Sequence, residues 1–133
     1  MDTTTIRHGP SAKLKLALQA DATVVAIAGI ALAAGADPIG NLLGFAPVFL
    51  RTIGIALLPW AAWVGLVGRR TGRTATRSVI AGNMLWVVAS ILMLVVQAID
   101  PNRLGIAFVL LQAVLVAVIA WWQVMSQRPA QAG

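Results

Sequence analysis

Polar side chains interrupt the long apolar runs of this sequence at a few positions, and chemistry could occur at these positions. The residues are Asp21, Arg51, Asn83, Trp86, Ser90 and Gln112. Polar groups in hydrocarbon are costly, usually face the interior of a helix bundle and mark functional sites. We therefore take these six residues as the candidate site.

Two interpretations of the polar set stay open. In the functional one, Asp21 is a proton- or cation-responsive carboxylate at the mouth of a cavity, and Asn83, Trp86 and Gln112 line that cavity. In the structural one, the side chains form hydrogen bonds between helices, and each bond stabilises the bundle by roughly 0.6–2 kcal/mol. The Ser90 hydroxyl can also donate a hydrogen bond to the backbone carbonyl four residues earlier in its own helix, and such a bond requires no functional role.

The depth of each polar residue predicts its partner. Asp21 and Asn83 each lie about five residues into an apolar run from the same side, so they should share a layer roughly 7–8 Å deep. We expect a hydrogen bond between them. Arg51 lies near the opposite end of its apolar run, on the other side of the predicted bundle. It should therefore be roughly 15 Å from Asp21 along the membrane normal. A salt bridge is therefore not expected, and Arg51 should reach Asp37 or Asp100 instead.

Missing residue types exclude several kinds of chemistry. The chain has no Cys, no Glu and no Tyr, and its one His is His8. This removes disulfides, thiol redox chemistry and iron–sulfur clusters, and it leaves no nucleophile–base pair. We expect no metal site, no cofactor and no enzymatic activity. The net charge of +6 comes from basic residues at the ends of apolar runs, so we expect no nucleic-acid partner.

The composition predicts a membrane protein. Of 133 residues, 59% are hydrophobic and 11% are charged, and the mean hydropathy is +0.87, far from the averages of soluble domains. Four runs are long enough to cross a bilayer, at about residues 16–35, 47–67, 78–98 and 104–125. We predict an all-α, membrane-embedded, up-down-up-down four-helix bundle over 16–126. A Gly/Asp/Pro loop at 35–41 joins its first two spans, and polar tails cover 1–15 and 127–133.

The basic residues predict the orientation. Eight lie on one side of the predicted spans and two, Arg51 and Arg103, on the other. The eight are Arg7, Lys13, Lys15, Arg69, Arg70, Arg73, Arg77 and Arg128. Basic loops stay in the cytoplasm. We therefore expect a multi-pass membrane protein with both termini cytoplasmic.

The two halves of the chain show a weak internal similarity. Asp37-Pro38 and Asp100-Pro101 lie 63 residues apart, and Trp60 and Trp121 lie 61 apart. This spacing is consistent with two parallel, repeated helical hairpins, whose interface would then hold a central site. Coincidence in an apolar chain is the alternative. Trp60, Trp63, Trp121 and Trp122 are interpreted as an aromatic belt.

Several short patterns carry a resemblance to a known kind of protein. They are Leu16 with Asp21, Leu50-Arg51 with Gly54, Leu57-Leu58-Pro59, Asn83 with Trp86 and Ser90, and Gly105 with Gln112-Ala113. Across residues 14–127 the sequence resembles a family of small, uncharacterised bacterial four-span membrane proteins. Its general architecture is also similar to that of DoxX-like proteins. The resemblance implies a four-helix bundle in the inner membrane and no particular activity.

These observations give two functional expectations. The first is a small membrane protein that binds or transports a hydrophobic or lipid-like molecule within the bundle. The second is a structural or accessory subunit of a larger membrane complex, since the short loops leave no soluble domain. Expected partners are the lipid bilayer, a hydrophobic ligand, and either a second copy of the chain or a membrane partner protein.

Overall fold

The computed structural model is all-helical and describes the backbone of residues 2–132 and the side chains of residues 12–127. It contains five helices and, within 2–132, no strand. They are α1 (Asp2–Ala34), α2 (Ala36–Leu43), α3 (Pro47–Arg70), α4 (Arg73–Val95) and α5 (Arg103–Ala132). The helical backbone thus continues through most of both expected tails. Most side chains of those tails, including Arg7 and Arg128, lie outside the described residues.

Four of the helices contain segments long and apolar enough to cross a membrane. These segments are Ala12–Ala34, Pro47–Arg70, Arg73–Val95 and Arg103–Gln127. They coincide with the four expected spans, but α4 begins five residues before the expected residue 78 and ends at Val95. Asp21 and Asn83 lie near the middle of their segments, roughly 14 and 15 Å from the segment starts, farther in than the expected 7–8 Å.

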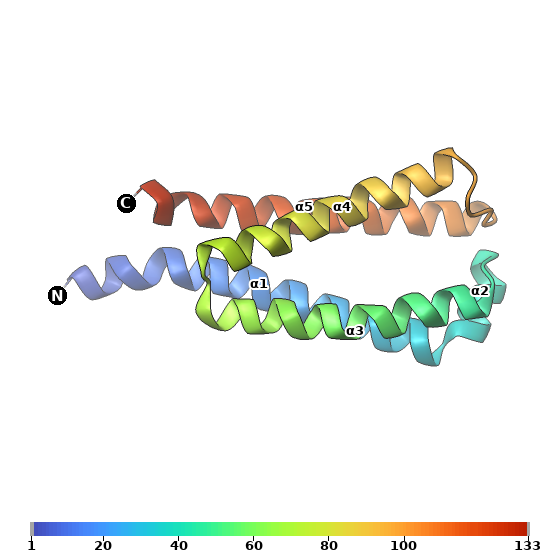
Figure 1. Cartoon of the computed structure of the whole chain (residues 1–133), viewed down its shortest axis with the longest axis horizontal. Coiled ribbons are helices and arrows are strands. Elements are labelled where there is room, and N and C mark those ends of the chain that lie inside the picture. The colour runs from blue at the N-terminus through green and yellow to red at the C-terminus, as the bar shows by residue number, and fades with distance from the viewer. Residues whose placement is uncertain (1, 133) are drawn as a thin grey trace.

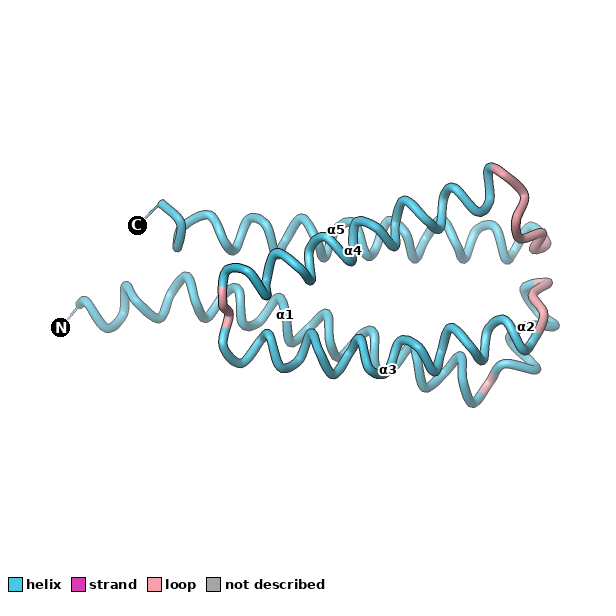
Figure 2. Tube along the Cα trace, in the orientation of Figure 1, coloured by secondary structure: helices cyan, strands magenta, loops and turns pink. Residues whose placement is uncertain are grey.

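The helices pack as two pairs that meet mainly where α1 contacts α5. α1 lies along α3, α4 lies along α5, and α1 also contacts α5. Figure 1 shows α3 and α4 diverging from the loop that joins them, and it shows both chain ends at the same end of the bundle. Figure 2 places α2 and the loop before α5 at the opposite end.

The α1–α3 contact is close because small residues meet there. A Cβ atom placed on Gly29 would lie 2.9 Å from the carbonyl oxygen of Gly54, and one on Gly54 would lie 2.7 Å from the carbonyl oxygen of Gly29. Small residues allow helix backbones to approach in this way. The small residues of the first predicted span therefore place α1 in the centre of the bundle, between α3 and α5.

Two apolar clusters hold the ends of the bundle. Near the chain termini, the buried cluster is Leu14, Leu18, Val64, Val67 and Val79. At the other end, it is Leu32, Ala36, Leu43, Phe45, Leu50 and Val109. Between 22% and 28% of each apolar segment is buried inside the protein, so most of its apolar surface remains available to lipid or to a partner.

The expected loop at 35–41 was wrong, because α2 occupies most of it. Asp37 lies in the first turn of α2, where a negative charge is favourable, and Pro38 follows where its missing N–H is not needed. The helix ends at Gly44, whose φ of 81° is the left-handed conformation that glycine adopts readily. Asn102 then ties α2 to α5, because its Nδ2 donates to the Leu42 carbonyl (2.9 Å) and its Oδ1 accepts from the Gly105 N–H (2.9 Å).

Candidate functional site

Three helices meet at a buried set of hydrogen bonds made by Asp21, Asn83 and Gln123, which we call the polar triad. Asn83 Nδ2 donates to Asp21 Oδ2 at 2.8 Å and to Gln123 Oε1 at 3.1 Å. Gln123 Nε2 donates to the same Asp21 oxygen at 2.7 Å. The expected hydrogen bond between Asp21 and Asn83 is therefore confirmed, and a third residue joins it.

Helical spacing brings the triad to the interior. The buried positions of α4 are Thr76, Val79 and Asn83, which lie on one helix face. The buried residues of α5 near Gln123 also recur three or four positions apart, at Ile119, Ala120, Ser126 and Gln127. On α1, the same spacing joins Asp21 to Ala17 and Leu18. Each triad residue thus belongs to the inward face of its helix, and each is at most 4% exposed.

The Asp21 carboxylate has amide donors and no basic partner within residues 12–127. No Lys or Arg nitrogen of this range lies within 4.0 Å of it, and the ion pair found within these residues joins Arg51 to Asp37 instead. Two N–H donors directed at one oxygen favour a carboxylate as acceptor. The arrangement can hold three helices in register, and it leaves a carboxylate without a fixed counter-ion in an apolar surrounding.

The remaining predicted site residues form separate contacts. Trp86 Nε1 donates to Gln112 Oε1 at 2.7 Å, which links α4 to α5. Gln112 Nε2 also donates to the Val109 carbonyl at 2.9 Å. The Ser90 hydroxyl donates to the Trp86 carbonyl at 2.7 Å, the bond within its own helix that was expected. These residues do not hydrogen-bond the polar triad.

Arg51 lies apart from both groups. Its Nη2 is 3.5 Å from Asp37 Oδ2, and the two side chains are 42% and 72% exposed. This confirms the expectation that Arg51 turns toward Asp37 rather than Asp21. An exposed ion pair of this length contributes little to stability, so Arg51 is not part of an interior site.

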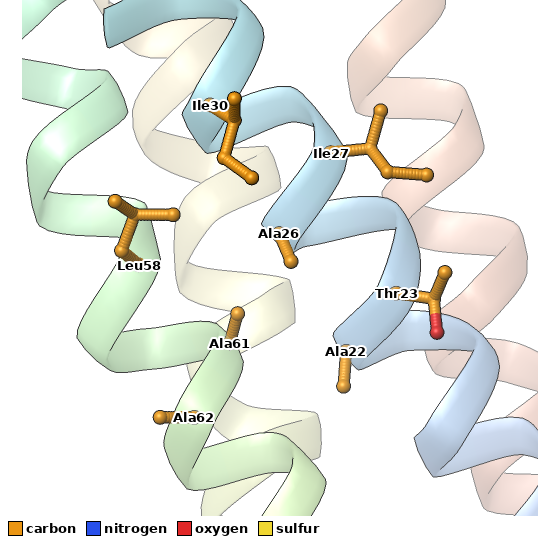
Figure 3. Close-up of a pocket in the computed structure, with 8 residues that line it drawn as sticks. All are labelled: Ala22, Thr23, Ala26, Ile27, Ile30, Leu58, Ala61 and Ala62. Atoms are coloured by element: carbon orange, nitrogen blue, oxygen red, sulfur yellow. The ribbon is translucent and has the colours of Figure 1, made fainter.

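An open groove of about 480 Å³ runs between α1 and α3. Figure 3 shows its lining side chains on these two helices. The lining consists of Ala22, Ala26, Ala61, Ala62, Ile27, Ile30, Leu58 and Thr23. Thr23 is the polar residue of this lining, and its hydroxyl donates a hydrogen bond to the Gln19 carbonyl at 2.8 Å. The groove is therefore apolar, and no triad residue lines it.

Gln123 was not predicted to be a site residue, and Trp60 was not predicted to pack inside the bundle. Gln123 follows Trp121 and Trp122 near the end of a predicted span, on the same side of the bundle as Asp21. Trp60 was interpreted as part of an aromatic belt. It is partly buried against the cluster near the chain termini, and its ring lies against Gly82 on α4. Trp121 is 64% exposed, so the two tryptophans that suggested a repeat have different surroundings.

Comparisons with known proteins identify no relative. No family model, curated protein or solved structure matches the chain. Within the described residues there is also no group of three or more His, Cys, Asp or Glu side chains that could hold a metal ion.

Proposed function

We propose that the chain is a multi-pass protein of the bacterial inner membrane with an up-down-up-down course and both termini in the cytoplasm. The four apolar segments and the placement of both chain ends at one end of the bundle support this proposal. The distribution of basic residues, eight against two, supports the orientation.

Within the membrane, the protein binds a hydrophobic or lipid-like molecule at the α1–α3 groove. The observation that carries this function is the groove itself. Its volume is about 480 Å³, and it is an open groove rather than an enclosed cavity, so an occupant lies against α1 and α3 and also contacts the surrounding lipid. Its alanines leave room between the helices, and its larger side chains are aliphatic. The occupant with matching chemistry is an acyl chain or a similar apolar tail, which the bilayer supplies at high concentration.

The polar residues have a different part in this function from the one first expected. Asp21, Asn83 and Gln112 bond other protein groups, and none of them lines the groove. They position α1, α4 and α5 and thereby support the α1 wall of the groove.

Filling the groove tests the function. We would compare wild type with Ala26→Phe, which places a ring in the groove, and with Ala81→Phe, a matched change at an exposed alanine of α4. Native mass spectrometry of protein released from lipid nanodiscs should show a retained apolar molecule in wild type and Ala81→Phe, but not in Ala26→Phe. Equal retention in all three would exclude the groove as the binding site.

A second candidate function is that of a structural or accessory subunit in a larger membrane complex. The large uncovered apolar surface of the four segments favours it, together with polar groups already paired inside the bundle. This function predicts a stable membrane partner that co-purifies in mild detergent. It also predicts that the bare chain retains no molecule in the nanodisc experiment.

A further inference from the structure

All buried polar side chains within residues 12–127 gather on the part of the bundle between its middle and the chain termini. They are Asp21, Thr76, Asn83, Gln123, Ser126 and Gln127, which we call the polar column. The buried cluster at the opposite end is entirely apolar. At 1.5 Å per residue, Thr76 lies roughly 5 Å from the start of α4, and Asn83 lies roughly 15 Å from it. The column therefore extends from one end of the bundle to its middle and stops there.

One member of the column lacks a partner within the described structure. The Thr76 side chain is fully buried, and its Oγ1 has no hydrogen bond. Other hydroxyls in these helices, such as those of Thr23, Thr52 and Ser90, donate to the carbonyl four residues earlier. A buried hydroxyl without a protein partner is commonly satisfied by water.

The backbones of α1 and α4 lie apart beside the column, and buried side chains occupy the interval. Along the described helices, no Cα atom of α1 lies within 8 Å of a Cα atom of α4. Asp21 and Asn83 nevertheless bond each other, so side chains alone bridge the two helices. Ala17 is fully buried one turn before Asp21 and contributes only a methyl group to this interval.

The inner end of the column carries a carboxylate, whereas basic residues, among them Lys13, Arg73 and Arg77, lie at the end where the column begins. Asp21 is the one acidic residue inside the four apolar segments, and no basic side chain of residues 12–127 pairs with it. A carboxylate in a low-dielectric surrounding attracts small cations strongly.

We propose that the polar column is a hydrated vestibule that fills from the end of the bundle carrying the termini, and that Asp21 attracts a small monovalent cation there. In this structure the column is closed, since its six side chains are at most 8% exposed. The vestibule ends at the polar triad, where apolar packing begins. It lies on the α4–α5 side of α1, apart from the α1–α3 groove. It depends on the proposed membrane embedding but not on binding in that groove.

The absence of native cysteine makes the vestibule directly testable. Single cysteines would be introduced into the full chain in membrane vesicles and exposed to Ag⁺ in nitrate buffer. Protected thiols would then be counted by maleimide labelling after denaturation. Ala17→Cys and Thr76→Cys probe the vestibule. Leu16→Cys is the matched control, because Leu16 is 62% exposed and adjacent to Ala17 at nearly the same depth.

We expect Ag⁺ to reach Ala17→Cys and Thr76→Cys much faster than Leu16→Cys. In Ala17→Cys, the further change Asp21→Asn should slow the reaction about tenfold, because it removes the attracting charge. In Ala17→Cys with Asp21 left intact, the rates of reaction with a cationic and an anionic methanethiosulfonate reagent are compared. Faster reaction with the cationic reagent also reports the negative charge of Asp21. Ala17→Cys reacting no faster than Leu16→Cys would overturn the vestibule. Equal rates with and without the Asp21 carboxylate, or no preference for the cationic reagent, would overturn its attraction of cations.

The side of the membrane on which each end of the bundle lies is measured separately. A wrongly assigned orientation is then not mistaken for the absence of water in the column. Gly72→Cys marks the end of the bundle with the termini, since a Cβ there meets nothing within 4 Å. The exposed Asn41→Cys marks the other end. The vestibule should open on whichever side labels Gly72→Cys. Access from the side that labels Asn41→Cys would contradict the proposal.

Discussion

Asn83 Nδ2 donates a 2.8 Å hydrogen bond to Asp21 Oδ2 across 62 residues of sequence, joining the α4–α5 pair to the α1–α3 pair. Asn83 also bonds Gln123, so one amide connects three helices. Removing it leaves the Asp21 carboxylate with fewer donors in a buried place, where an unsatisfied polar group costs about 1–3 kcal/mol.

Asn83→Ala should therefore lower the free energy of unfolding by about 1–2 kcal/mol. The measurement is thermal or denaturant unfolding in detergent, monitored by helical circular dichroism. Met84→Ala is the control, because Met84 is the next residue of α4 and is exposed. If Asn83→Ala were as stable as Met84→Ala, the triad would not hold the two helix pairs together.

Gly82 should tolerate no side chain, because the Trp60 ring occupies that space. A Cβ on Gly82 would lie 2.8 Å from Trp60 Cζ2 and closer still to the tip of the ring. Overpacking of this kind costs about 1–3 kcal/mol, so Gly82→Ala should lower the melting temperature. Gly72→Ala should be nearly neutral, since its Cβ meets nothing within 4 Å.

The second variant in this series is a rescue. Trp60→Leu removes the ring, so the cost of Gly82→Ala should be smaller in a chain that already carries Trp60→Leu. A double-mutant cycle measures this difference. Additive effects would mean that the ring moves aside freely and does not hold α3 against α4.

The parts of the structure that could be predicted from sequence depend on length and depth. Four apolar runs of sufficient length gave the four long helices, because the number of residues needed to cross a bilayer is set by the helical rise. Counting residues from each end paired Asp21 with Asn83 and separated both from Arg51. Those contacts needed no knowledge of how each helix is rotated.

The features that were missed depend on rotation and on neighbours. The hydrophobic side chains of α4 and α5 are spread around each helix, so they do not mark which face is inward. Gln123 was therefore not distinguished from the exposed residues beside it, and Trp60 was not recognised as packed against Gly82. α2 was missed because Pro38 suggested a turn, whereas a proline in the first turn of a helix is well tolerated.

Substitution of Asn102 should lower the free energy of unfolding more than its place in a loop implies. Asn102 caps α5 through the Gly105 N–H and ties α5 to α2 through the Leu42 carbonyl. Asn102→Ala loses both bonds and should cost about 1–2 kcal/mol, since loss of a cap alone costs about 1 kcal/mol. Asn102→Ser keeps a capping oxygen and should cost less.

Hydrogen exchange separates the two contributions of Asn102. The Gly105 amide should exchange faster in Asn102→Ala than in Asn102→Ser, because only serine still accepts its hydrogen bond. Equal exchange in the two variants would show that the cap does not protect the first turn of α5.

Arg51→Gln should change the free energy of unfolding by less than about 0.5 kcal/mol, because an exposed ion pair contributes little. The Arg51 Nη2 atom is 3.5 Å from Asp37 Oδ2, and both side chains are substantially exposed. The measurement is unfolding of wild type and Arg51→Gln in detergent at low and high salt, with Asp37→Asn as the matched change at the partner. All three chains should unfold together, with any small difference disappearing in high salt as the charges are screened. A loss above about 1 kcal/mol in Arg51→Gln alone would mean that this guanidinium stabilises the bundle through a group other than Asp37.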